Sequence, residues 1–372
     1  MAGAQRLKFN FAIMNKKINL AVIFGGKSGE HEVSLSSARG VMKNLDKEKY
    51  NIVPIAITKG GNWLIGEKAD EYLKMNEDKI GKEGAISLED SQKLVTTKGK
   101  ERNFFNYAEG ELKEKIDLVF PILHGPYGED GRLQGMLDML GVPYVFSGVL
   151  AHAIGMNKPK AKIIAATAGV PVAKDIVIKK KEKFDLDEII EKLSLPLIVK
   201  PAELGSSVGV SLAKTKKDVE KAIREAFSYG DEIILEQYIK GREFTVTVMG
   251  DENPQALAVT EIIPLISEFY DYKAKYEEGG SKHVCPAKVS KEDEEKLKKY
   301  AVATFEAIGC QDLARVDFLW SESDNEYYFT DINTIPGMTP TSLAPEAAAL
   351  VGMNFSQFLD KLIERAMRRS KK

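Results

Sequence analysis

The sequence is poor in the features that mark several classes of protein. Its 372 residues include only two cysteines, Cys285 and Cys310, and neither lies in a metal-binding spacing such as CxxC. We therefore expect a reduced, cytoplasmic setting and no structural disulfide. No apolar run approaches the ~20 residues that a membrane-spanning helix needs. Residues 1–16 lack the apolar core and cleavage site of a secretory signal, so we set them aside as a tail or leader.

Charge of one sign is also lacking. Lysine and arginine number 53 against 55 aspartates and glutamates, which gives a net charge of −2 with both signs interspersed. This balance argues against nucleic acid or an anionic membrane as the main partner. With 44% hydrophobic and 29% charged residues, the composition is that of an ordinary globular protein, and the length is sufficient for two or three domains.

The first part of the chain predicts an α/β domain. Short apolar runs at Ile18–Gly26, Tyr50–Thr58 and Ile116–Leu123 are typical of buried parallel strands, and helical spacing follows the first and the last of them. A further short strand is expected in VPYVFSG, before Gly148, and only loops and small elements in the polar stretch 66–115. Residues 17–147 should therefore form a doubly wound, Rossmann-like domain.

Two polar residues stand at the ends of these strands, where α/β folds place their ligands. Glu30 begins the helix after the Gly-rich turn GGKSGE. It is either a first-turn acid favoured by the helix dipole or the binding site of a substrate ammonium. His124 follows the strand Ile116–Leu123 and is either a hydrogen-bonded structural residue or a ligand contact. The turn itself is neither a Walker A loop nor a complete dinucleotide fingerprint.

The middle of the chain carries a candidate phosphate loop. A helix is expected over Ala151–Ala168, with Lys158 in its middle. Lys200–Val210, KPAELGSSVGV, places glycines and small hydroxyls after a buried strand. Its N–H groups could cradle a phosphate beside Lys200, or the segment could be a plain glycine-rich turn. Two strands around Lys240-Gly241 then form either a wall that reads a purine and a ribose or an ordinary hairpin.

The stretch Asp312–Ser342 predicts a β-hairpin with a polar face. Alternation puts Arg315 and Asp317 on one face of the first strand, and folding back near Asp324-Asn325 brings them opposite residues 331–334. The carboxylates there suit Mg²⁺, or they form an ordinary Arg–Asp pair on a charged sheet face. A bulge or an odd-numbered loop is needed to keep 317 and 331 on the same face.

Two other segments complete the chain. Phe269–Ala287 is long, charged and glycine-containing, with aromatic and lysine residues interleaved. That pattern allows nucleic-acid contact, but the overall charge balance favours a lid that closes over a site. From Ala344 onward the chain should end in an amphipathic helix with a basic last turn.

Seven motifs together resemble one known family. GGKSGEHEVSLSSA, HGPYGEDGRLQG, KPAELGSSVGV, EQYIKGREFTV, FYDYKAKY, RVDFL and DINTIPGMTPTS occur in the order seen in D-alanine–D-alanine ligases of the ATP-grasp fold. The resemblance spans roughly residues 17 to 368. It implies an N-terminal α/β domain (17–147), a central ATP-grasp subdomain (148–240) and a C-terminal subdomain (241–372) with the lid and the metal-binding hairpin. ATP would lie between the last two.

The resemblance also implies residue roles for the cofactors. The residues that would contact ATP are Lys158, Lys200, Ser207, Glu236, Tyr238, Ile239, Glu243 and Lys275. The ligands of two Mg²⁺ ions, with Mn²⁺ as a substitute, would be Asp317, Asp331 and Asn333. The family more often has Glu where Asp331 stands, so this ligand is shorter by one methylene.

The remaining roles concern D-alanine. Glu30 would bind the ammonium of the first D-alanine, next to His124, and Ser342 the carboxylate of the second. Arg315 and the N–H of Gly337 would stabilise the oxyanion, while Ser206 and Tyr276 would tie the phosphate loop to the lid.

The implied reaction is ATP-dependent ligation of two D-alanines through an acylphosphate, for peptidoglycan precursors, by a cytoplasmic homodimer. Three alternatives stay open: a ligase that makes D-Ala–D-lactate or D-Ala–D-serine, a nucleotide-binding protein without turnover, and a nicotinamide dehydrogenase built on the first domain. The last lacks the complete glycine fingerprint.

Overall fold

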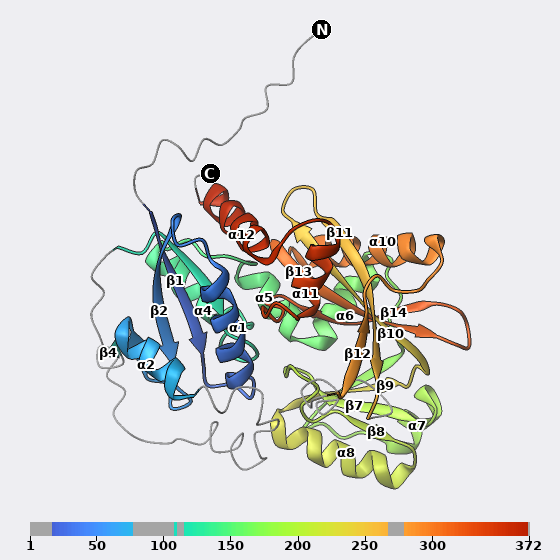
Figure 1. Cartoon of the computed structure of the whole chain (residues 1–372). Coiled ribbons are helices and arrows are strands. Elements are labelled where there is room, and N and C mark those ends of the chain that lie inside the picture. Colours follow the sequence, from blue (N-terminus) through green and yellow to red (C-terminus); the bar gives the residue numbers. More distant parts are fainter. Residues whose placement is uncertain (1–16, 77–107, 110–114, 267–278, 371–372) are drawn as a thin grey trace.

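The computed structural model describes residues 17–76, 108–109, 115–266 and 279–370. Among these residues the chain forms three sheets, each covered by helices (Figure 1). The first sheet comes from the N-terminal part, the second from the middle of the chain, and the third from the C-terminal part. The mixed α/β class expected from the sequence is therefore confirmed. No helix of the described part is long and apolar enough to cross a membrane.

The N-terminal sheet has the order β4-β3-β2-β1-β5, and β1 pairs in parallel with both β2 and β5. Alternate residues of β1 pack on opposite faces: Leu20, Val22 and Phe24 join the core that contains α1 and α12, whereas Ala21 and Ile23 face α4. Burial on both faces explains the continuous apolar run and confirms the doubly wound arrangement. The elements are β1 (Ile18–Gly25), α1 (His31–Asn44), β2 (Tyr50–Ile57), β3 (Trp63–Ile65), α2 (Glu67–Met75), β4 (Ala108–Glu109), β5 (Leu118–Ile122) and α4 (Arg132–Leu140).

The central sheet is antiparallel, with the order β6-β9-β7-β8. Its apolar face packs against α7 and α8. The sequence reading did not assign α8, although Thr215 and Asp218 form the capping box that begins it. The elements are β6 (Asp175–Lys179), α7 (Leu186–Leu193), β7 (Leu197–Pro201), β8 (Ser211–Ala213), α8 (Lys216–Tyr229) and β9 (Glu232–Gln237).

The C-terminal sheet has the order β12-β11-β10-β13-β14 and is antiparallel throughout. Helices α5, α6 and α10 share its core, so α5 and α6 pack on this sheet although they precede the central one in sequence. The subdomain boundaries after residues 147 and 240 stay a prediction. The elements are α5 (Val149–Met156), α6 (Lys158–Thr167), β10 (Gly241–Gly250), β11 (Gln255–Pro264), β12 (Ser281–Val284), α10 (Lys291–Ile308), β13 (Asp312–Ser321), β14 (Tyr327–Asn333), α11 (Leu343–Leu350) and α12 (Phe355–Arg369).

Two sequence expectations need correction, and the first concerns the helix over Ala151–Ala168. The helix is broken into α5 and α6 at Asn157, whose side chain accepts a hydrogen bond from the Lys160 N–H and so caps α6. Pro159 is the cause, because proline has no N–H and is tolerated only in the first turn of a helix. Lys158 therefore stands at the start of a helix and not in its middle.

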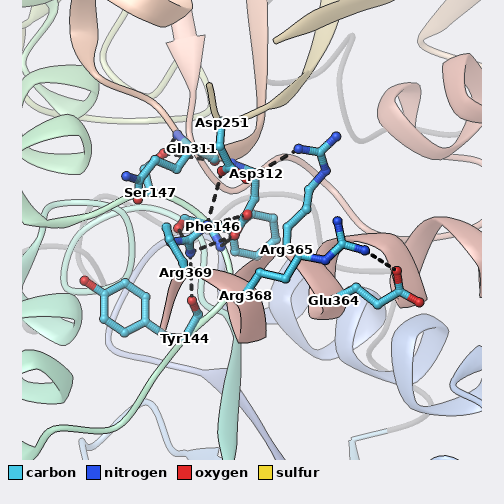
Figure 2. Close-up of polar contacts among 10 residues, drawn as sticks. All are labelled: Tyr144, Phe146, Ser147, Asp251, Gln311, Asp312, Glu364, Arg365, Arg368 and Arg369. Carbon is cyan, nitrogen blue, oxygen red and sulfur yellow. Dashed lines mark hydrogen bonds and ion pairs between the residues drawn. The ribbon is translucent and has the colours of Figure 1, made fainter. Parts of the chain in front are cut away.

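The second correction concerns VPYVFSG, which forms no strand but only one isolated bridge, between Val119 and Tyr144. Its backbone groups are used elsewhere. The Phe146 N–H donates to the carboxylate of Asp312 (2.8 Å), and the carbonyls of Tyr144 and Phe146 accept from Arg369 (both 3.1 Å; Figure 2). Arg369 also pairs with Asp312, so α12 joins the end of the N-terminal domain to the first residue of β13.

The lid expected over Phe269–Ala287 stays a prediction. Within Phe269–Ala287 the described residues include a strand, β12, which pairs antiparallel with β11. Residues 267–278 lie outside the described part.

Candidate active site

Glu30 lies where the N-terminal domain meets the central phosphate loop. It occupies the N-cap position of α1, and its Oε1 accepts a hydrogen bond from the hydroxyl of Ser206. Two glycines make this approach possible, because a Cβ on Gly125 or Gly205 would lie 2.6 Å from Glu30 Oε2. The resemblance gave Glu30 and Ser206 separate roles, a substrate ammonium site and a link between the phosphate loop and the lid, and both roles stay predictions. A direct contact between them was not expected.

The phosphate loop has unusual backbone geometry. Ser206 and Ser207 both adopt left-handed conformations (φ 52° and 58°), followed by Gly209 at φ 71°. A left-handed serine costs of order 1–3 kcal/mol unless its surroundings hold it there, and such strain clusters at ligand-binding loops. This conformation favours the interpretation of residues 200–210 as a ligand loop over that of an ordinary turn.

His124 is buried, and both of its ring nitrogens have partners. Nε2 lies 3.1 Å from Ser37 Oγ, and Nδ1 lies 3.1 Å from the carbonyl oxygen of Ile335. Burial lowers the pKa of this imidazole, although the nearby charge of Glu30 opposes the shift. The geometry therefore favours the structural alternative for His124, and its role in binding D-alanine stays a prediction.

Glu129 is a site residue that the sequence reading missed. Its carboxylate is almost fully buried and accepts the N–H of Gly125 (2.8 Å) and the N–H of Ile335 (2.9 Å). Burial and the charge of Glu30 raise the pKa of Glu129 to about 8, against the opposing effect of the two N–H donors. The signal was an acid just beyond a buried strand, in the same turn as His124.

Glu129 should give the protein a pH-dependent stability. Between about pH 5 and 8 the folded state binds a proton that the unfolded chain has released, because the pKa in the folded state is the higher one. The free energy of unfolding should then fall by up to ~1.4 kcal/mol per pH unit as the pH rises. Chemical denaturation at a series of pH values measures this slope.

The Glu129→Gln variant tests whether Glu129 causes this change of the free energy of unfolding with pH. The variant should be less stable at every pH, because its amide N–H faces one of the two backbone N–H groups. Its stability should nevertheless change less between pH 5 and 8. If the free energy of unfolding changed equally with pH in the wild type and the variant, Glu129 would not be the cause of the pH dependence.

Two lysines on one face of α6 reach toward the phosphate loop and the central sheet. Lys158 Nζ donates to the Leu204 carbonyl (2.7 Å) and lies 3.2 Å from Asp331 of the hairpin. Lys162, four residues on and therefore on the same face, lies 2.7 Å from Glu236. The sequence reading missed Lys162, although the i, i+4 spacing in KPKAK was visible.

Glu236 is the centre of a buried charge cluster. Lys200 and Lys162 each lie 2.7 Å from its carboxylate. Burial alone would raise the pKa of Glu236, but the two lysines hold it down at about 2. Glu236 and Lys200 were both predicted as nucleotide contacts, and the structure brings them together. Tyr238 and Ile239 follow as half-buried residues, and Glu243 lies in β10.

The hairpin has the expected register. Arg315 pairs with Asn333, and Asp317 pairs with Asp331. A bulge between Asp317 and Phe318 keeps 317 and 331 on one face, as the sequence required. Val316, Phe318 and Ile332 are buried in the core on the other side, as expected.

Asp317 is the most heavily hydrogen-bonded residue of this face. Arg315 donates to both of its oxygens (2.9 Å each), Thr245 Oγ1 donates to Oδ1 (2.5 Å), and Asn333 Nδ2 donates to Oδ2 (3.0 Å). Of the two alternatives that the sequence left open, the Arg–Asp pair is present, and the role of these oxygens as Mg²⁺ ligands stays a prediction. Within the described residues no three His, Cys, Asp or Glu side chains form a metal-type cluster.

The turn after the hairpin brings Gly337 and Ser342 together. A Cβ on Gly337 would lie 3.0 Å from Ser342 Oγ, so the two residues are in close contact. Ser342 stands at the N-cap of α11 but does not cap it, and its Oγ instead accepts the Thr339 N–H (3.0 Å). Lys275 and Tyr276, the two site residues predicted in the lid, lie outside the described residues.

Comparison with known proteins covers nearly the whole chain. Residues 19–147 match the family model described as D-ala D-ala ligase N-terminus, and residues 164–364 match the D-ala D-ala ligase C-terminus model. The chain is 41% identical to a D-alanine–D-alanine ligase of Acetivibrio thermocellus, over 96% of this chain and 97% of that one. It is 42% identical to the ligase of Chloroherpeton thalassium, over 96% and 98%.

Solved structures agree. The D-alanine–D-alanine ligase of Coxiella burnetii superposes with a TM-score of 0.76 at 29% identity, covering 95% of this chain and 96% of that one. A D-Ala:D-Ser ligase from Enterococcus faecalis gives 0.75 at 35% identity (94% and 100%). The Bacillus anthracis D-alanine–D-alanine ligase complexed with ATP gives 0.70 at 29% (95% and 99%). The matched family models and the relatives at about 40% identity lead to one conclusion: the chain belongs to the D-alanine–D-alanine ligase family.

Proposed function

We propose that the protein joins two D-alanines to D-alanyl-D-alanine with ATP, in the cytoplasm and as a homodimer, for peptidoglycan precursor synthesis. The observation that carries the proposal is the hydrogen bond between Ser206 and Glu30. It places the strained loop of the central sheet against the acid that begins α1. A phosphate on that loop and an amino acid at Glu30 would therefore be neighbours.

ATP would lie between the central and the C-terminal sheets. Lys158 and Lys200 would face its phosphates with the N–H groups around Ser207, and Lys200 pairs with Glu236, 2.7 Å away. Tyr238, Ile239 and Glu243 continue the same wall toward the base and the ribose. Lys158 supports this arrangement, because it contacts both the phosphate loop and the hairpin.

The hairpin residues fit Mg²⁺ by their donor chemistry. Asp317 and Asp331 supply carboxylates and Asn333 an amide oxygen, and hard oxygen ligands of this number, completed by phosphate and water, are what Mg²⁺ prefers. Lys158 and Arg315 balance these carboxylates in the structure described here. When bound, the cation would neutralise phosphate charge during transfer.

The chemistry proceeds in two displacements. The carboxylate of the first D-alanine, held through its ammonium by Glu30, attacks the γ-phosphorus of ATP, and ADP leaves. The neutral amine of the second D-alanine, bound through its carboxylate at Ser342, then attacks the acyl carbon and forms the C–N bond. The C–O bond breaks, phosphate departs with the bonding electrons, and the proton that the nitrogen loses passes to the phosphate. Arg315 and the Gly337 N–H would stabilise the oxyanion formed between these events.

D-Alanine should be required for ADP release. Purified protein with ATP and Mg²⁺ should release ADP on the order of 10²-fold or more faster with D-alanine than with L-alanine, because the two amino-acid sites are built for one configuration. A coupled assay for ADP measures this. Equal rates with both enantiomers, or none with either, would refute the ligase proposal and favour a nucleotide-binding role.

One observation favours a second function, which differs from the first only in the substrate that accepts the D-alanyl group. A D-Ala:D-Ser ligase is among the solved structures similar to this chain, at 35% identity. Mass spectrometry of the product formed from D-alanine with equimolar D-serine and D-lactate shows which of these three acceptors is used. We expect D-alanyl-D-alanine as the main product.

A further inference from the structure

Three buried residues, Thr334, Ile335 and Pro336, connect the proposed metal ligand Asn333 to the proposed oxyanion donor Gly337. Any movement of this short link would displace both groups. How the link is held therefore bears on the precision of the site.

Helix α5 contacts both the hydroxyl and the methyl group of the Thr334 side chain. Nδ1 of His152 lies 2.6 Å from Thr334 Oγ1. One turn further along α5, a Cβ on Gly155 would lie 3.0 Å from Thr334 Cγ2, so the helix and the link are in close contact. His152 is fully buried (0% exposed), which leaves it no alternative rotamer in solvent.

The loop after β5 holds Ile335 from the other direction. Glu129 accepts its N–H (2.9 Å), and Nδ1 of His124 lies 3.1 Å from its carbonyl oxygen. Thr334 and Ile335 are thus fixed by side chains from two separate elements. Of these contacts, the one to His152 lies nearest in sequence to Asn333.

A buried histidine at this position costs free energy of folding, which a purely structural role would not explain. Burial lowers its pKa to about 3, although a backbone hydrogen bond with Ser147 opposes the shift, so the ring is neutral. Its Nε2 has no hydrogen-bond partner within the described residues. A buried, unsatisfied nitrogen costs free energy that an apolar side chain of similar size would avoid. The hydrogen bonds to Thr334 and to the backbone of Ser147 offset part of this cost.

We propose that His152 is a positioning residue for the Mg²⁺ site: its hydrogen bond to Thr334 fixes the end of β14, from which Asn333 projects. The inference rests on the proposed metal site. Because Asn333 Nδ2 is directed at Asp317, Oδ1 is the atom that would face the cation, and its place depends on the backbone of residues 333 and 334.

The test measures Mn²⁺ affinity in the presence of ADP by electron paramagnetic resonance, without turnover. Thr334→Val removes the hydroxyl and keeps the shape, and His152→Leu removes its partner. Each should weaken Mn²⁺ binding by about 3- to 10-fold, as expected for one lost hydrogen bond. The double variant should be no weaker than the weaker single variant, and His152→Asn, whose amide can reach the same place, should restore affinity to within about twofold.

Two further variants distinguish an error in the proposed metal site from an error in the proposed role of His152. Thr304→Val also replaces a buried threonine, whose hydroxyl donates to Tyr300 within α10 (2.9 Å), and should leave Mn²⁺ affinity unchanged. Asp317→Asn should weaken Mn²⁺ binding strongly; if it does not, the metal site is wrong and the inference falls with it. If Asp317→Asn weakens Mn²⁺ binding and Thr334→Val leaves it unchanged, His152 has no positioning role. This holds even if Thr334→Val has a lower melting temperature.

Discussion

Replacing Arg315 with alanine is expected to lower kcat by about 10²- to 10³-fold, the usual effect of removing one donor from an oxyanion site. Arg315 lies on β13 with only a small part of its side chain exposed, and its guanidinium is held in place by both oxygens of Asp317. A donor fixed in this way needs no reorganisation when charge develops on the substrate. Steady-state rates of ADP release with saturating D-alanine and ATP measure the loss.

The same variant should bind Mg²⁺ at least as well as the wild type. The guanidinium and the cation compete for one carboxylate, because both oxygens of Asp317 accept hydrogen bonds from Arg315. Thr245 and Asn333 still donate to Asp317 in the variant, and the guanidinium no longer competes with the metal for this carboxylate. Weaker metal binding in the variant would show that Arg315 builds the metal site and does not act on the oxyanion.

Arg242→Ala is the matched control. Arg242 makes the same two-pronged pair, with Nε and NH2 each 2.8 Å from an oxygen of Glu261, and it lies on the neighbouring strand of the same sheet. Its side chain is more exposed, and it belongs to none of the groups assigned to the reaction. A comparable loss of kcat in both variants would point to a general effect of disturbing the sheet.

The local parts of this site could be predicted from the sequence because side-chain alternation is a local rule. Arg315, Asp317, Asp331 and Asn333 share a face once the hairpin closes, and even the need for a bulge followed from counting residues between 317 and 331. Glu30 was found for a similar reason, since strand ends in an α/β sheet meet at one edge.

The failures came from contacts between distant segments. Nothing near residue 144 indicates that VPYVFSG gives up its strand, because the competing partners are Asp312 and Arg369, far along the chain. His124 and Glu129 likewise have Ile335 as a common partner, about 200 residues away. The break at Pro159 is different: its signal was local, and the apolar helical spacing on both sides concealed it.

The buried ion pair of α12 gives the second large effect, on stability. Asp312 is fully buried and begins β13 in a left-handed conformation (φ 57°), with Arg369 NH2 2.9 Å from its Oδ2 (Figure 2). Arg369→Met should lower the free energy of unfolding by about 3–5 kcal/mol, since one charge of a buried pair is left without its partner. The carbonyls of Tyr144 and Phe146 lose their donor as well. Urea denaturation of the two proteins measures the difference.

Arg368→Met is the control, because it removes the same charge one residue earlier. Arg368 is largely exposed and lies 3.7 Å from Glu364, so its loss should change stability by no more than about 0.5 kcal/mol (Figure 2). Adding Asp312→Asn to Arg369→Met should recover part of the loss, because the neutral amide no longer requires a cation. If Arg369→Met and Arg368→Met are equally mild, Arg369 does not hold the N-terminal domain to β13, and the packing of α12 against the core of β1 must do so alone.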